Sequence, residues 1–152
     1  MRIIKSITVV IMSLFYIGVG VMHFINPKPF LIIIPDYFPN DVHLFLVYVS
    51  GFFEIILGVF LLIEKTRFIS ALGLILLLIA VFPANIFLYT NDIAREAYGS
   101  ISQEQALLRM FFQLPLIIIA YWHSQTKSSS MFSYFSFTTF CVTIIYFSYI
   151  LF

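Results

Sequence analysis

The sequence predicts an all-α, polytopic membrane protein: a four-helix bundle followed by one additional C-terminal transmembrane helix. Of its 152 residues, 62% are hydrophobic and 10% are charged, and the mean hydropathy is +1.06. This composition leaves too little polar surface for a soluble domain of this size. Five apolar runs separated by short polar segments supply the predicted helices. We expect residues 1–130 to form the four-helix domain and residues 131–152 the fifth helix.

Several functional classes are excluded by residue usage. The charges lie in short clusters between the apolar runs rather than on one basic face, so the net charge of +1 gives no sign of nucleic-acid binding. The single cysteine, Cys141, excludes an internal disulfide and a CxxC redox pair. The three histidines fall at three different helix boundaries, so we expect no metal or haem site within one chain.

The first apolar run, Ile3–Ile25, follows Arg2 and Lys5, an arrangement that secretory signal peptides also show. Gly18-Val19-Gly20 would offer small residues for cleavage. However, the run is longer than a typical signal-peptide core and ends in the cluster His23–Pro27. These two features favour a retained transmembrane helix.

The segment Asn26–Asp41 holds four of the six prolines. Prolines at this density end helices and forbid a regular strand, so we expect an irregular loop. Its apolar part, Phe30–Ile34, is expected to dip into the membrane interface and to act as a lid. The second helix is predicted over Val42–Ile63, with Asn40 or Asp41 as its N-terminal cap.

The third helix is predicted over Phe68–Leu88, and the short charged turn Glu64–Arg67 makes it an antiparallel hairpin with the second. A polar loop separates it from a fourth helix over Gln105–Trp122. The last apolar run, Met131–Phe152, is rich in Ser, Thr, Phe and Tyr and has no charged residue. Its β-branched and aromatic residues are weaker helix formers, but its length favours a fifth helix.

The Lys and Arg residues of the loops predict the orientation. Arg109 is left out because it lies inside a predicted span. With the N-terminus inside, five basic residues fall on the cytoplasmic side and two outside, which favours an inside N-terminus and an outside C-terminus. The five are Arg2, Lys5, Lys65, Arg67 and Lys127, and the two are Lys28 and Arg95.

Glu54 lies near the middle of the second apolar run. An ionisable residue at that depth costs about 3 kcal/mol on membrane-insertion scales, so it is a functional-site hypothesis by default. Gly51, Glu54 and Gly58 share one helix face, and the two glycines would let a neighbouring backbone approach beside the carboxyl group. The structural alternative is a neutral, buried carboxylic acid that only holds helices together.

Four further polar residues point to the same region. Arg109 and Gln113 lie one turn apart on the fourth helix, and His23 and Asn85 lie near the outer ends of the first and third. At a rise of 1.5 Å per residue, Gln113 lies about 12 Å and Glu54 about 18 Å from the outer helix ends. The other three lie within about 3–6 Å of those ends. We therefore expect a ladder of polar groups that descends to Glu54, with Gln113 rather than Arg109 as its first neighbour.

Each of these polar residues also has a purely structural interpretation. His23 would be an interfacial residue or cap. Asn85 would satisfy the backbone carbonyl that the nearby proline frees. Arg109 would extend its side chain to the outer surface. The remaining histidines, His43 and His123, are expected at the membrane interfaces.

Taken together, these motifs resemble those of the DoxX-like membrane proteins over about Ile3–Trp122. The resemblance implies a four-helix bundle in the cytoplasmic membrane of a prokaryote, and an association with quinone-linked redox chemistry and a redox partner protein. The run after residue 130 lies beyond the usual core of that family. The motifs, in chain order, are His23-Phe24 with Pro27, Ser50-Gly51-x-x-Glu54-x-x-x-Gly58, Phe82-Pro83-Ala84-Asn85, and Arg109-x-x-x-Gln113 before Tyr121-Trp122.

The leading hypothesis is an outward-opening polar pocket that binds a small lipophilic ligand, such as a quinone, in a subunit of a redox system. Glu54 would hold or relay a proton as the catalytic residue. The ligand-binding residues would be His23, Asn85, Arg109 and Gln113. A non-catalytic assembly or chaperone subunit is the alternative, and a proton-coupled transporter is less suited because the chain has no repeat. Whether the protein is an enzyme, and whether it forms a homo-oligomer, stay open.

Overall fold

A computed structural model describes residues 2–151 and the side chains of residues 2–148. Within these residues the backbone forms eight helices and no strand, so the all-α prediction is confirmed. Five helical stretches are long and apolar enough to cross a membrane. They are α1 (Arg2–Ile25), α3 (Asn40–Leu62), α4 (Arg67–Thr90), α6 with α7 (Gln103–Ser124) and α8, of which Ser130–Ser148 meets the criterion.

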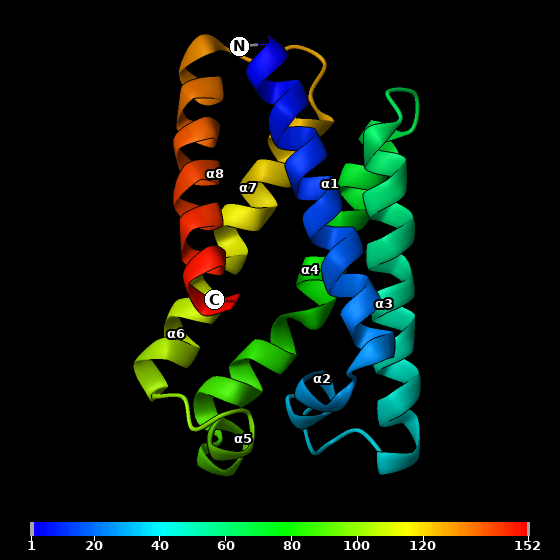
Figure 1. The fold of residues 1–152 in the computed structure, drawn as a ribbon, viewed down its shortest axis with the longest axis vertical. Coiled ribbons are helices and arrows are strands. Elements are labelled where there is room, and N and C mark those ends of the chain that lie inside the picture. The colour runs from blue at the N-terminus through cyan, green and yellow to red at the C-terminus, as the bar shows by residue number, and fades with distance from the viewer. Residues whose placement is uncertain (1, 152) are drawn as a thin grey trace.

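The long helices pack in an order that follows the chain. α1 lies antiparallel along α3, and α4 packs against α3 (Figure 1). α7 (Gln113–Ser124) packs against α4, and α8 (Ser130–Leu151) packs against α7 and also contacts α1. The turn between α3 and α4 is closed by Arg67, whose Nε donates to the Leu61 carbonyl at 3.1 Å. The short charged turn therefore produces the predicted hairpin.

The predicted fourth helix is interrupted. α6 (Gln103–Phe111) ends at Phe111, and α7 begins at Gln113, after the single intervening residue Phe112. Pro115 accounts for the break because it has no N–H to donate to the carbonyl of Phe111, four residues earlier. The span predicted over Gln105–Trp122 is therefore present as α6 with α7, but it is interrupted at Phe112 rather than continuous.

Two short helices stand where the sequence predicted loops. In the proline-rich segment, α2 (Lys28–Ile32) begins directly after Pro27, because proline is compatible with the first turn of a helix. α5 (Asp92–Ala97) is capped by the Asn91 side chain, which accepts from the Ala94 N–H at 2.9 Å. The expected side-chain cap of the second long helix is absent, because Pro39 occupies the cap position of α3.

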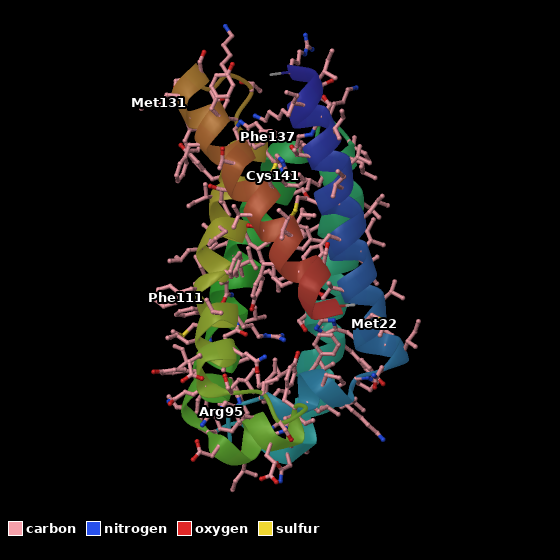
Figure 2. The ribbon with its side chains drawn as sticks, turned by 60° about the vertical axis from the view of Figure 1, so that its left-hand side comes forward. Met22, Arg95, Phe111, Met131, Phe137 and Cys141 are labelled. Atoms are coloured by element: carbon pink, nitrogen blue, oxygen red, sulfur yellow. The ribbon has the colours of Figure 1, made fainter. Side chains whose placement is uncertain are left out.

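Apolar side chains fill the interior and also cover the outside of the long helices. Ile69 is 71% exposed, Leu76 67% and Ile145 69%. Met22 on α1 and Phe111 on α6 point away from the neighbouring helices in Figure 2. An outer surface this apolar is unfavourable in water and suits a hydrocarbon surrounding. The main buried cluster is formed by Val9, Met12, Tyr16, Leu61, Ala71, Leu74, Leu78, Leu116, Ile119, Ala120 and Phe140.

The two ends of the molecule differ in charge. The start of α1, the α3–α4 turn and the α7–α8 connection lie at one end, and α2 and α5 lie at the other (Figure 1). Five of the eight Lys and Arg residues belong to the first end. Arg95 lies at the opposite end from Met131 (Figure 2).

His123 was expected at a membrane interface; it lies in the last turn of α7, but its side chain is enclosed rather than exposed. Its side chain belongs to the first end of the molecule but is buried, with 2% of the residue exposed. Its Nε2 lies 3.0 Å from the Thr8 hydroxyl. Close by, Lys5 donates to the Gln125 carbonyl at 2.6 Å and lies 5.5 Å from the centre of the Trp122 ring. Contacts between α1 and the end of α7 therefore enclose the histidine.

Candidate functional site

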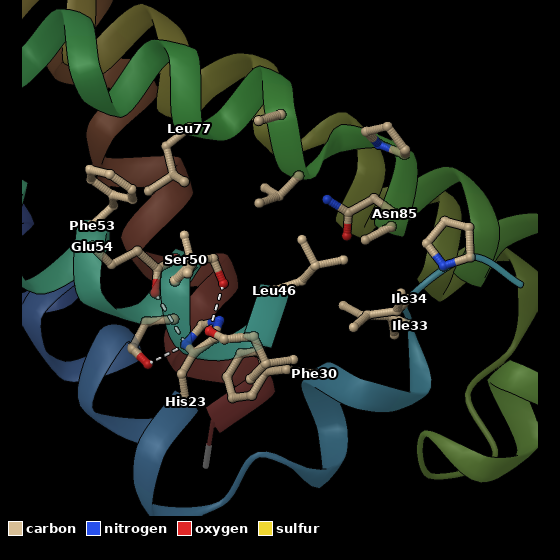
Figure 3. Close-up of a pocket in the computed structure, with 18 of the residues that line it drawn as sticks. His23, Phe30, Ile33, Ile34, Leu46, Ser50, Phe53, Glu54, Leu77 and Asn85 are labelled. Carbon is tan, nitrogen blue, oxygen red and sulfur yellow. Dashed lines mark hydrogen bonds and ion pairs between the residues drawn. The ribbon is translucent and has the colours of Figure 1, made fainter. Parts of the chain in front are cut away.

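A pocket of about 330 Å³ lies between α1, α3, α4 and the segment 30–38, at the end of the molecule that holds α2 (Figure 3). Its walls are mostly apolar, with Phe30, Ile33 and Leu46 among the lining residues. The lining polar side chains are those of His23, Ser50, Glu54, Asn85 and Arg109. Apolar walls with a few placed polar groups are typical of small-molecule sites.

At one side of the pocket His23 meets Glu54. The His23 Nδ1 lies 3.2 Å from the Glu54 Oε2 and 2.9 Å from the Val19 carbonyl oxygen (Figure 3). A carbonyl oxygen only accepts, so Nδ1 carries the hydrogen of the Val19 contact. The side chain of His23 is 7% exposed to solvent and that of Glu54 is 16% exposed. The Phe30 ring of α2 stacks on the imidazole at a centroid distance of 3.5 Å and covers it.

Glycines bring these two helices together. A Cβ built on Gly51 would stand 2.5 Å from the His23 Cβ, and one built on Gly20 would stand 2.7 Å from the Gly51 carbonyl oxygen. Two helical turns further, a Cβ on Gly58 would lie 3.1 Å from the Ser13 carbonyl oxygen. The expectation that the glycine face of the second long helix receives a neighbouring backbone is therefore confirmed. That neighbour is α1.

A second polar cluster is built around Asn85 on α4. Its Nδ2 donates to the Gln113 Oε1 at 2.8 Å, and its Oδ1 accepts from the Arg109 Nε at 3.1 Å. Arg109 also donates through Nη1 to the Tyr98 hydroxyl, and its guanidinium lies 4.9 Å from the centre of that ring. Gln113 in turn donates to the Leu78 carbonyl of α4. These bonds join α4, α6, α7 and the connection after α5 into one hydrogen-bonded chain.

The contacts of Asn85 decide between the interpretations of that residue. The carbonyl that Pro83 frees is that of Ile79, four residues earlier, and Asn85 does not bond to it. The side chain instead holds α6 and α7 through Arg109 and Gln113. Arg109 does not simply extend to the surface, because Asn85 and Tyr98 hold its guanidinium.

The expected contact between Gln113 and Glu54 is not formed. Glu54 faces His23, and Gln113 does not line the pocket. The predicted depths were wrong because the outer ends of the helices do not lie at one level. Glu54 follows the start of α3 by about four helical turns, whereas His23 lies less than one turn from the end of α1. α3 therefore projects beyond α1, and the two residues lie at the same level.

A family model matches residues 12–124 of the chain, and its description is Domain of unknown function (DUF8561). The chain belongs to this family. No curated protein and no solved structure matches it. The matched residues of this DUF8561 member include all those that line the pocket, as well as Tyr98 and Gln113. All of α8 and the whole α7–α8 connection lie outside the match.

Two side chains that shape this site in the DUF8561 member were not predicted from the sequence. Phe30 was expected in a lid, but not stacked on His23. Tyr98 was placed in a polar loop without a role, because the α5 helix that positions it was not recognised. The Asn91 cap signal three residues before Ala94 could have revealed that helix.

The chemistry that the pocket offers is that of an acid, an imidazole and a guanidinium among apolar walls. Among the described residues no group of three or more His, Cys, Asp or Glu side chains could hold a metal ion. The arrangement suits recognition of an apolar molecule with one or two polar groups.

Proposed function

We propose that the protein is an integral membrane protein whose pocket binds a small lipophilic ligand. The observation that carries this proposal is the pocket of about 330 Å³ with apolar walls, a His23–Glu54 pair and the Arg109 guanidinium. Its volume falls in the range of about 300–1,000 Å³ that is typical of small-molecule sites. Polar groups of this kind inside an apolar helical assembly mark function more often than packing.

In this proposal α1, α3, α4 and the α6–α7 pair form a four-helix bundle, and α8 is an additional transmembrane helix. The packing of α3 on α1, of α4 on α3 and of α7 on α4 supports it. The end with five Lys and Arg residues would face the cytoplasm, by the positive-inside rule. In a cytoplasmic membrane the N-terminus would then lie on the cytoplasmic side and the C-terminus on the outer side. The pocket would open toward the outer side.

A quinone is the ligand that the resemblance to DoxX-like proteins suggests, and that resemblance stays a prediction. When bound, a quinone would supply two-electron redox chemistry, with a partner protein as the source or acceptor of electrons. The chain's own residues fit its chemistry in part. Arg109 would donate to a carbonyl oxygen, and Glu54 would hold a proton beside the ring. Phe30 would exclude water from the imidazole side.

The experiment is to purify the protein in a mild detergent and to analyse the extracted lipids by mass spectrometry. We expect a lipophilic compound that is enriched over the membrane extract and is lost in Glu54→Gln and Arg109→Ala variants. Glu64→Gln, in the exposed α3–α4 turn, is the matched control and keeps the compound. A lipid content identical to that of the membrane, in wild type and variants alike, would contradict the proposal.

A non-catalytic assembly or chaperone subunit is the second candidate. The hydrogen-bonded chain from Tyr98 through Arg109, Asn85 and Gln113 to the Leu78 carbonyl favours it, because these bonds serve packing without any ligand. In that case the Glu54→Gln variant changes melting temperature or recovery of a partner, and the lipid content stays the same. Crosslinking in membranes followed by mass spectrometry would then identify a stoichiometric partner, or a second copy of this chain.

A further inference from the structure

The carboxyl group of Glu54 has no hydrogen-bond donor among the described residues. Its Oε2 is buried without a hydrogen-bond partner, although the His23 Nδ1 lies 3.2 Å away. The reason is that the Nδ1 hydrogen points to the Val19 carbonyl at 2.9 Å. With that hydrogen in place Nδ1 has no lone pair, so it cannot accept a proton from Glu54 either. His23 therefore positions the carboxyl group without satisfying it.

Two other polar side chains of the pocket, those of Ser50 and Asn85, are already engaged. The Ser50 hydroxyl donates to the Val47 carbonyl at 2.9 Å. The Asn85 Nδ2 and Oδ1 are bonded to Gln113 and Arg109, respectively. In Figure 3 the apolar side chain of Leu46 lies between the Glu54 side and the Asn85 side. The protein thus leaves the Glu54 carboxyl group as a pocket acceptor that receives no hydrogen bond from the described residues.

The accessible edge of the carboxyl group faces the pocket. Glu54 lines the pocket, and its side chain keeps 16% of its exposure although Oε2 is buried. A ligand donor that enters the pocket would therefore approach the carboxyl group from this exposed side. Burial of Oε2 has removed its bonds to water and the protein supplies none in return, so a donor that reaches the carboxyl group would be favoured.

We propose that the ligand presents a hydroxyl group to Glu54, so that the pocket selects lipophilic alcohols, phenols or hydroquinones over their ethers and ketones. This inference rests on the proposed function and names the ligand class for the same pocket. A hydroxyl both donates and accepts, so it pairs with Glu54 whether the carboxyl group is ionised or protonated. An ether or carbonyl oxygen only accepts, so it pairs with the protonated form alone.

Three probes that share a decyl-substituted six-membered ring and differ in its oxygen groups test the inference. They are a 1,4-hydroquinone, its dimethyl ether and the corresponding 1,4-quinone. Binding to the full chain in detergent is measured by anaerobic titration calorimetry. At a pH at which Glu54 is ionised, we expect the hydroquinone to bind about tenfold more tightly than the other two, as for loss of one hydrogen bond to a charged group. This comparison uses the wild-type protein, so it does not depend on whether any variant folds.

Variants then locate the acceptor. Glu54→Gln keeps a neutral acceptor and is expected to reduce the hydroquinone preference, whereas Glu54→Met removes the acceptor and is expected to abolish it. Glu64→Gln is the control and keeps the full preference. Ratios between wild type and variant cancel the partition of each probe into micelles.

The outcomes separate the two proposals. If none of the three probes binds, the proposed lipophilic pocket fails. If all three bind with equal affinity, the pocket stands and the hydroxyl inference is overturned. If the hydroquinone preference persists in Glu54→Met, another group is the acceptor and the inference is likewise overturned.

Discussion

Gly51 on α3 and His23 on α1 are in backbone-to-side-chain contact: a Cβ built on Gly51 would stand 2.5 Å from the His23 Cβ and 2.9 Å from the Gly20 carbonyl oxygen. This contact sets the distance between α1 and α3 at the level where the imidazole meets Glu54. The contact between Glu54 and His23 therefore depends on the absence of a Cβ at Gly51, about one helical turn before Glu54.

We expect Gly51→Ala to lower stability by about 1–3 kcal/mol, because an added methyl group in a closed contact must push α1 and α3 apart. Thermal unfolding in detergent measures the change. Gly18→Ala on α1 is the matched control, since a Cβ there meets nothing within 4 Å. It is expected to be neutral or stabilising by up to about 1 kcal/mol, the helix preference of alanine over glycine. Equal melting temperatures for the two variants would contradict the prediction.

Asn85→Ala is expected to destabilise the protein by about 1–3 kcal/mol, because it leaves the Arg109 Nε and the Gln113 Oε1 without their partner. A double-mutant cycle with Gln113→Ala should give a coupling energy of about 0.5–3 kcal/mol. Thr90→Ala, near the end of the same helix, is the control, since its hydroxyl bonds only to its own helix backbone. Strict additivity of the two changes would argue against the bonded chain.

Thr8→Val removes the hydrogen-bond partner of buried His123 while keeping the side-chain shape. The loss is expected to cost about 1–3 kcal/mol, because the imidazole nitrogen stays buried with no partner in its place. Unfolding of the detergent-solubilised protein measures it. Ser6→Ala, two residues earlier and exposed, removes a hydroxyl with little expected effect. A Thr8→Val protein as stable as Ser6→Ala would show that the contact contributes nothing.

Phe30→Ala removes the ring that covers His23 and opens the pocket at α2. On the proposed function, a bound hydroquinone probe should dissociate about three- to tenfold faster, as expected for loss of one aromatic contact. Stopped-flow dilution measures the dissociation rate. Phe24→Ala is the control, because Phe24 stacks on Tyr48 at a centroid distance of 5.2 Å and does not line the pocket. Unchanged dissociation in Phe30→Ala would mean that α2 is not a lid.

The long helices could be predicted from the sequence because apolar length alone selects them. The predicted bounds of the third, Phe68–Leu88, fall one and two residues inside α4. The interruption at Phe112 was missed although Pro115 was visible, because hydropathy averages over a break of one residue. α2 was missed for the opposite reason. Its prolines were read as helix breakers, whereas Pro27 and Pro29 stand at its start, where proline is tolerated.

The members of the candidate site could be chosen from the sequence, but not their partners. Intramembrane Glu54 and Arg109 stand out by residue type alone. Their neighbours depend on how far each helix projects, and α3 projects beyond α1 by a length that no local pattern encodes. The same holds for Tyr98, which reaches Arg109 only because α5 and the turn after it fold back.

The Tyr146 ring of α8 lies parallel to that of Phe112, at a centroid distance of 3.7 Å. Phe112 is the break between α6 and α7, with Arg109 three residues before it and Gln113 directly after it. Every pocket-lining residue lies within the family match, but this stacked ring comes from the helix beyond it. α8 therefore buttresses the pocket indirectly: it contributes no lining residue, but its Tyr146 ring packs on the residue that joins the helix of Arg109 to the helix of Gln113.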